Sequence, residues 1–146
     1  MDNFKVPYPY KGQHHCEVVV LFCMDHRYAR LVQDFIYKRF DVDRFDPIAV
    51  AGGAKTVNDS EDLVDRCFGV SRNLHEVKTI VIVNHSDCGA YGGRKKFATV
   101  SEEDDFHYQE LNKAKAIMCQ KFSDKEIIAV FARLNEEETE LEFIEI

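Results

Sequence analysis

The sequence predicts an α/β fold with a mostly parallel central sheet, helices on both faces of that sheet, and an antiparallel strand at its C-terminal edge. Apolar, β-branched runs typical of buried strands alternate with segments of helical periodicity along most of the chain. This alternation implies parallel pairing with right-handed crossovers. Only a short acidic turn separates the last two strands, which favours an antiparallel hairpin at the sheet edge.

Two strands and one helix are predicted in the first third of the chain. Residues 17–22 form the run E-V-V-V-L-F, which is typical of a strand buried on both faces. A helix is predicted over residues 28–40. Its apolar stripe comprises Leu31, Val32, Phe35 and Ile36. Residues 47–51 form a short second strand that ends at Gly52-Gly53.

Caps and periodicity predict the remaining elements. Asn58, with Glu61 three residues later, is predicted to cap the start of a helix. The apolar face of that helix comprises Leu63, Val64, Cys67, Phe68 and Val70. The later elements are a buried strand at residues 79–83, a helix at residues 102–122, and hairpin strands at residues 126–134 and 139–146. Exposed Glu residues on the last strand would protect this edge of the sheet.

Length and charge restrict the classes of protein that fit. A chain of 146 residues accommodates one domain, with an N-terminal arm at residues 1–16 and a single α/β domain at residues 17–146. The formal net charge of −7 disfavours binding to nucleic-acid phosphates. The longest apolar run, residues 18–24, is too short to cross a bilayer, and the N-terminus lacks the features of a signal peptide. We therefore expect a cytoplasmic protein with reduced cysteines.

Two polar motifs begin where predicted strands end. Residues 23–27 read C-M-D-H-R and follow the first strand, and residues 85–89 read H-S-D-C-G and follow the third. In doubly wound sheets the ligand crevice lies at the carboxyl ends of the strands, where the strand order reverses. If the second and third strands flank the first, the two motifs face each other across that crevice.

Cys23, His85 and Cys88 have the side chains that bind Zn²⁺ in proteins. A structural zinc site usually offers four Cys or His ligands, whereas only three converge here, so we expect a fourth position that opens to water or a carboxylate. The alternative is a pair of buried thiols beside a capped histidine. Three further cysteines are interpreted as core or free thiols, any of which would close the site as a fourth sulfur: Cys16, Cys67 and Cys119.

Asp25 and Arg27 lie beside the first predicted ligand and suggest how the fourth position is controlled. Two thiolates cancel the charge of Zn²⁺, so water on this metal is harder to deprotonate than water on a zinc held by three histidines. The Asp25 carboxylate would orient the nucleophile, and the Arg27 guanidinium would hold that carboxylate away from the metal. If the pair broke, Asp25 would become the fourth ligand. A purely local salt bridge is the alternative.

These residues resemble the motifs of the β-class carbonic anhydrases. The chain carries their Cys-x-Asp-x-Arg motif at residues 23–27, their His-x-x-Cys motif at residues 85–88, and an Ala-Gly turn at residues 51–53. The resemblance runs from about Gly12 to the C-terminus and includes the acidic hairpin. The sequence is similar to a short, divergent member of that family.

The resemblance implies a zinc-dependent lyase in which zinc-bound hydroxide reversibly hydrates CO₂ to bicarbonate. It makes the two cysteines and His85 the zinc ligands, and Asp25 with Arg27 the catalytic pair. Gly89 is assigned to substrate binding, as is Gln13, which lies near the place of a substrate-binding glutamine in some family members. The resemblance further implies a homodimer or dimer of dimers, with the arm lying on the partner. From the net charge and the short apolar runs we expect no nucleic-acid or membrane partner.

The chain departs from the family in two respects. Ala49-Val50 stand where the family commonly has Arg-Asn before the Ala-Gly turn, which removes a charge that supports the interface or the site. The chain also lacks most of the N-terminal helical arm and the long segment before the final strands. Two alternatives therefore stay open: a non-catalytic zinc-binding or regulatory module, and a hydrolase of a related small molecule such as CS₂ or COS.

Weaker signals have other interpretations. Residues 88–94 fit the Cys-x₅-Arg spacing of a cysteine-phosphatase loop, but lack the His before the Cys and the Ser or Thr after the Arg. The basic run at residues 94–96 is interpreted as a solvated spot. For His26 a proton relay is weighed against a packing or polar role. The other histidines are interpreted as surface or capping residues: His14, His15, His75 and His107.

Overall fold

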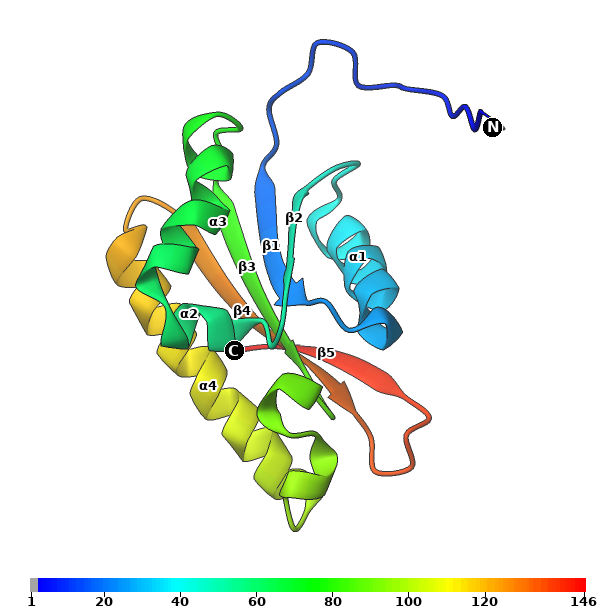
Figure 1. The fold of residues 1–146 in the computed structure, drawn as a ribbon, viewed down its shortest axis with the longest axis vertical. Coiled ribbons are helices and arrows are strands. Elements are labelled where there is room, and N and C mark those ends of the chain that lie inside the picture. Colours follow the sequence, from blue (N-terminus) through cyan, green and yellow to red (C-terminus); the bar gives the residue numbers. More distant parts are fainter. Residues whose placement is uncertain (1–2) are drawn as a thin grey trace.

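The fold is a five-stranded sheet with helices on both faces (Figure 1). A computed structural model describes residues 3–146, so the first two residues of the predicted arm lie outside the described part. The strands are β1 (Val18–Cys23), β2 (Asp46–Val50), β3 (Thr79–His85), β4 (Glu126–Leu134) and β5 (Leu141–Glu145). Their order is β2-β1-β3-β4-β5, with β5 antiparallel to β4 and all other pairs parallel. The predicted fold class is confirmed, including the reversal of strand order at β1.

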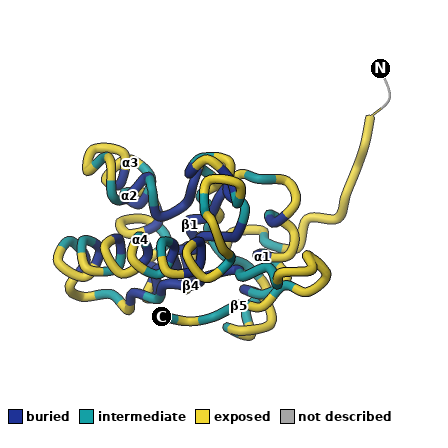
Figure 2. Tube along the Cα trace, turned by 90° about the horizontal axis from the view of Figure 1, so that it is seen from below, coloured by how far each residue is buried: buried dark blue, intermediate teal, exposed yellow. Residues whose placement is uncertain are grey.

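The two faces of the sheet are covered unequally. One face packs against the single helix α1 (His26–Phe40), and the other against α2 (Ala54–Asp59), α3 (Glu61–Asn73) and α4 (Val100–Lys121). Two single-turn 3₁₀ helices, η1 (Gly89–Tyr91) and η2 (Arg94–Lys96), follow β3. β1 and β3 are buried along their whole length, and Figure 2 shows β1 and β4 at the buried centre of the molecule. Because β1 and β3 are parallel neighbours, the residues at their carboxyl ends lie at the same edge of the sheet.

The predicted helix start at Asn58 is wrong. Residues 54–59 form α2, which the sequence analysis missed, and Asn58 lies inside this helix. α3 begins one residue after Ser60, whose hydroxyl oxygen accepts a hydrogen bond from the Leu63 N–H at 3.4 Å. Serine and asparagine cap helices about equally well, so cap preference alone does not select the start of α3. That start is set by the break in the helix at Ser60, which separates α2 from α3.

The buried stripes of α1 and α3 are rotated from the predicted ones. In α1 the fully buried positions are spaced four residues apart: Tyr28, Val32 and Ile36. Leu31 is left exposed, as are Leu63 and Val70 on α3. Each helix therefore buries a narrower stripe than its apolar residues predict, and part of its apolar surface faces solvent.

The start of α2 depends on a close approach of two backbones. Gly53 has a φ of +52°, and a Cβ at this position would lie 2.3 Å from the carbonyl oxygen of Val83 in β3. The N–H of Ala54 donates to the side-chain oxygen of Asn84 at 2.8 Å. Glycine is required here because both the left-handed backbone and the contact exclude a side chain.

Residues 3–16 form no helix or strand, and their first part extends away from the domain (Figures 1 and 2). The Tyr10 hydroxyl donates to the carbonyl oxygen of Asp43 at 3.1 Å, and three large apolar side chains of the segment are exposed: Phe4, Val6 and Tyr8. In the described part of the chain, no helix combines the length and the apolar character needed to cross a membrane.

Replacing Gly53 with alanine is expected to destabilise the protein by at least about 2 kcal/mol, because the left-handed backbone and the contact with Val83 each oppose a Cβ. Urea unfolding measures this change. Gly69→Ala is the matched control: Gly69 lies within α3 and a Cβ there meets nothing within 4 Å, so this change should be neutral or stabilising by up to about 1 kcal/mol. Equal stability of the two variants would contradict the argument.

Candidate metal centre

The parallel pairing of β1 with β3 brings the two predicted motifs together. Cys23 ends β1 and His85 ends β3, at the same edge of the sheet, and Cys88 follows three residues later. One ligand atom of each residue lies within 4.8 Å of the others. The three residues are buried, with exposed fractions of 7% for Cys23 and 2% for His85 and Cys88. The structure therefore assembles the predicted ligand set.

The ring of His85 is oriented for a ligand. Its Nδ1 lies 2.7 Å from the carbonyl oxygen of Ser86, and because a carbonyl only accepts, Nδ1 carries the proton. The lone pair then resides on Nε2, which is buried and has no hydrogen-bond partner among the described residues. Tyr28 stacks on the ring with a centroid distance of 4.0 Å. An unpartnered imidazole nitrogen beside two thiols fits a soft or borderline metal such as zinc.

The two sulfur atoms share one hydrogen bond. The Cys88 thiol donates to Cys23 Sγ across 3.8 Å, and the N–H of Gly52 donates to the same sulfur at 3.4 Å. The bond from Cys88 lowers the pKa of Cys23 and raises that of Cys88, because only one of two adjacent sulfurs is readily charged. A bound dication would stabilise the charge on both.

Asp25 and Arg27 form a charge-assisted pair at the edge of the centre. The Arg27 guanidinium donates to Asp25 from Nη2 at 2.7 Å and from Nε at 3.1 Å. These bonds lower the pKa of Asp25 to about 2, so the side chain is a carboxylate. Asp25 is also the N-cap of α1, since its Oδ1 accepts from the Arg27 backbone N–H at 3.0 Å. The same guanidinium donates from Nη1 to Asp87 Oδ2 at 2.7 Å.

A cleft of about 400 Å³ opens onto the metal centre. Its lining includes Cys23, Asp25 and Arg27, together with Met24, His26, Ala51, Gly89 and Ala90. Gly89 therefore borders the space in which a small substrate would meet the metal. The side chain of His26 is 95% exposed, so packing does not explain its presence in the motif.

The structure brings neither Gln13 nor a third cysteine to the centre. Gln13 precedes β1, at the opposite end of that strand from Cys23, and its side-chain oxygen accepts from Arg44 Nη1 at 2.7 Å. Cys16 is buried near the start of β1, and Cys119 is exposed on α4. Among residues 3–146, no fourth Cys, His, Asp or Glu places a ligand atom within the same 4.8 Å cluster.

The prediction that Arg94 belongs to a solvated basic spot is wrong. Its side chain is 17% exposed and donates to Glu103 at 2.8 Å and to the carbonyl oxygens of Leu134 and Asn135. Lys95 and Lys96 are exposed, as predicted. Because the Arg94 guanidinium is occupied by these partners, the loop after Cys88 lacks the free guanidinium that a phosphatase loop requires.

His107 was interpreted as a surface or capping residue, and this is wrong. It is fully buried between Tyr91, Phe106 and Phe131. Its Nδ1 lies 3.3 Å from the side-chain nitrogen of Asn84. Burial lowers the pKa of His107 to about 3. A histidine among polar helix positions gave no sequence signal of burial, since its partners are distant in the chain.

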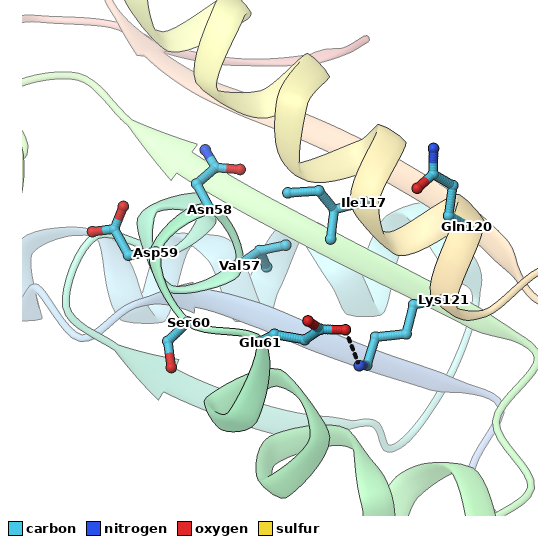
Figure 3. A pocket seen from close by; sticks show the side chains of 8 residues that line it. All are labelled: Val57, Asn58, Asp59, Ser60, Glu61, Ile117, Gln120 and Lys121. Atoms are coloured by element: carbon cyan, nitrogen blue, oxygen red, sulfur yellow. Dashed lines mark hydrogen bonds and ion pairs between the residues drawn. The ribbon is translucent and has the colours of Figure 1, made fainter.

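A second hollow lies between the α2–α3 junction and the last turns of α4, with a volume of about 500 Å³ (Figure 3). It shares no residue with the metal centre. Lys121 is paired with Glu61 at 3.2 Å, as the figure shows, and with Asp65 at 2.9 Å. Asp59 is paired with Lys55. The charged groups of this hollow are thus neutralised within the chain.

The strand order and the Cys-His-Cys cluster define a protein with the β-carbonic anhydrase fold. A carbonic anhydrase from Glaciozyma antarctica superposes with a TM-score of 0.59 at 15% identity, covering 92% of this chain and 85% of that one. The β-carbonic anhydrase isoform I of Trichomonas vaginalis superposes with a TM-score of 0.58 at 15% identity, covering 99% of this chain and 87% of that one.

Sequence comparison places the chain within a family. Residues 13–144 match the family described as "Putative carbonic anhydrase", and the chain belongs to that family. An uncharacterized protein of Rickettsia bellii is 23% identical over 120 residues, which are 77% of this chain and 73% of the relative. An uncharacterized protein of Rickettsia conorii is 26% identical over 120 residues, 77% of this chain and 64% of the relative. The family resemblance inferred from the motifs is confirmed.

Cys23→Ser is expected to abolish tight metal binding, because serine replaces a thiolate ligand with a weak neutral one. Wild-type protein should bind about one Zn²⁺ per chain and unfold at a higher temperature when loaded. Elemental analysis after dialysis and thermal unfolding measure both effects. Cys119→Ser, at an exposed thiol, should leave both unchanged. Retention of zinc by Cys23→Ser would contradict the ligand assignment.

Burial of His107 predicts a stability that falls with acidification. Its pKa is lowered from 6.5 to about 3 in the folded state, so the unfolded chain binds the proton first. Stability from this group is therefore present above pH 6.5 and is lost as the pH falls toward 3. Between pH 6.5 and 5, wild type should lose about 2 kcal/mol more than His107→Phe in urea unfolding.

Exposed His14→Gln is the control for this comparison and should follow the wild-type pH dependence. Parallel pH profiles for wild type and His107→Phe would show that the buried ring is not kept neutral.

Proposed function

We propose that this protein is a zinc-dependent enzyme that reversibly hydrates CO₂ to bicarbonate. The observation that carries the proposal is the buried Cys23, His85 and Cys88 cluster, with three ligands and an adjoining cleft. A structural site would be closed by four protein ligands, whereas three cluster here and one of them, Cys23, lines a cleft together with Asp25 and Arg27. The family to which the chain belongs supports the reaction class.

The residues around the cluster suit this reaction. Zn²⁺ bound by the three ligands would supply a Lewis acid that makes water nucleophilic. The Asp25 carboxylate stays ionised because its pKa is lowered to about 2. It can therefore accept a hydrogen bond from the attacking water and orient it. Met24, Ala51 and Ala90 give the cleft apolar walls, which suit an uncharged, linear substrate.

The proposal extends to assembly and location. A homodimer or dimer of dimers would cover the exposed apolar side chains of the N-terminal arm, of which Phe4 is 93% exposed. In such an assembly Gln13 of one protomer would serve a partner's site, since it lies far from the metal centre of its own chain. Gly89, which borders the cleft, would contact substrate. The compartment proposed is the cytoplasm.

Zinc-loaded protein is expected to hydrate CO₂ in a stopped-flow assay with a pH indicator. Asp25→Asn should lower kcat by roughly 100-fold while zinc content is retained, because the amide cannot act as an ionised acceptor for the nucleophile. Asp34→Asn, an exposed carboxylate of α1 paired with Arg30, is the matched control and should keep full activity.

Three outcomes discriminate among the functions that share this fold. Absence of CO₂ hydration by zinc-replete protein at alkaline pH would refute the carbonic anhydrase proposal. Turnover of CS₂ or COS in its place would assign the hydrolase alternative. A four-ligand site that stays unchanged with pH, together with unfolding on metal removal, would assign a non-catalytic zinc module.

A further inference from the structure

A chain of charged side chains continues behind the Asp25–Arg27 pair. Arg27 Nη1 donates to Asp87 Oδ2 at 2.7 Å, and Nη2 donates to the Asp87 carbonyl oxygen at 3.1 Å. Glu103, which is fully buried, accepts from the Asp87 N–H at 2.6 Å and from Arg94 Nε at 2.8 Å. The Arg94 N–H in turn donates to Asp87 Oδ1 at 2.8 Å. Asp87 is thus held on one side and holds Arg27 on the other.

The two oxygens of Asp87 have separate tasks. Oδ1 closes the loop of residues 87–94 by accepting from the Arg94 backbone N–H at 2.8 Å. Oδ2 is not needed for that loop and accepts from Arg27, sixty positions away in the sequence. The Arg27 side chain is 46% exposed, and its Nη1 donates to the Asp87 carboxylate. Without that carboxylate, one edge of the guanidinium would lose its acceptor while Asp25 still held the other edge. The loop alone therefore does not explain why both oxygens are engaged.

We propose that Asp87, fixed by Glu103 and Arg94, is a positioning residue that locks the Arg27 guanidinium and thereby keeps the Asp25 carboxylate aimed at the cleft. Arg27 is planar and presents donors along two edges, which lets it bridge two carboxylates in a fixed geometry. Glu103 thus fixes the backbone of Asp87, the Asp87 side chain fixes Arg27, and Arg27 orients Asp25. This inference rests on the role proposed above for Asp25 in CO₂ hydration.

Asp87→Asn separates positioning from folding. Asp87 has a φ of +54°, and asparagine adopts this left-handed backbone readily. If the amide oxygen keeps the bond from the Arg94 N–H, the amide nitrogen faces Arg27 Nη1, and two donors oppose each other. The variant thus retains the loop and the bond from Arg27 to the backbone carbonyl, and loses the bond between the Arg27 and Asp87 side chains. Asp34→Asn on α1 is again the matched control.

The first measurement is hydrogen exchange of the Arg27 Nε–H by ¹⁵N NMR, which needs no activity. We expect exchange at least about ten-fold faster in Asp87→Asn than in wild type or Asp34→Asn. The second measurement is CO₂ hydration by the zinc-loaded proteins. Here Asp87→Asn should lower kcat about ten-fold, with KM within two-fold of wild type and zinc content unchanged, since an orienting role acts on the chemical step.

Unchanged exchange at Arg27, or loss of zinc in Asp87→Asn, overturns the inference, because the residue would then leave Arg27 alone or merely support Cys88. If Asp87→Asn does not fold, Asp87→Gly replaces it, since glycine accepts the same backbone without strain. Failure of both variants to fold makes Asp87 structural and also overturns the inference. If wild type lacks CO₂ hydration, the proposed function fails, while the exchange data still decide whether Asp87 immobilises Arg27.

Discussion

The metal centre depends on the parallel register between β1 and β3. Phe22 pairs with Val83, so Cys23 and His85 emerge at one edge of the sheet. Both strands are buried on both faces, and successive side chains point to opposite faces. A slip of one residue would turn Cys23 toward the wrong layer and also expose apolar side chains. The burial of the two strands therefore fixes the relative positions of Cys23 and His85.

The end of β3 serves both layers of the protein at once. His85 faces α1, where Tyr28 stacks on its ring. Asn84 faces the opposite layer, where its oxygen accepts from Ala54 at the start of α2 and its nitrogen approaches His107 of α4. Of these two adjacent polar residues, His85 is a candidate ligand, and Asn84 contacts α2 and α4 on the opposite face of the sheet. This arrangement explains why a sheet interior tolerates polar side chains at this position.

The sheet and the ligand set were predictable because their signals are local. Continuous apolar runs mark β1 and β3, and the candidate ligands lie at or just after the ends of these runs. α2 escaped prediction because six residues are too few to show a helical period, and its start is set by Asn84 thirty positions away. The contacts of Asp87 likewise depend on the distant side chains of Arg27 and Glu103. Sequence spacing does not predict such long-range contacts.

The dual use of Asp25 has an energetic consequence for the site. Its carboxylate begins α1 by accepting from the Arg27 N–H, so any rotation toward the metal leaves the first turn of that helix uncapped. Losing an N-cap costs about 1 kcal/mol, which favours the resting rotamer by roughly five-fold. If Asp25 controls access to a metal as proposed, the cap of α1 would favour the rotamer that leaves the metal open.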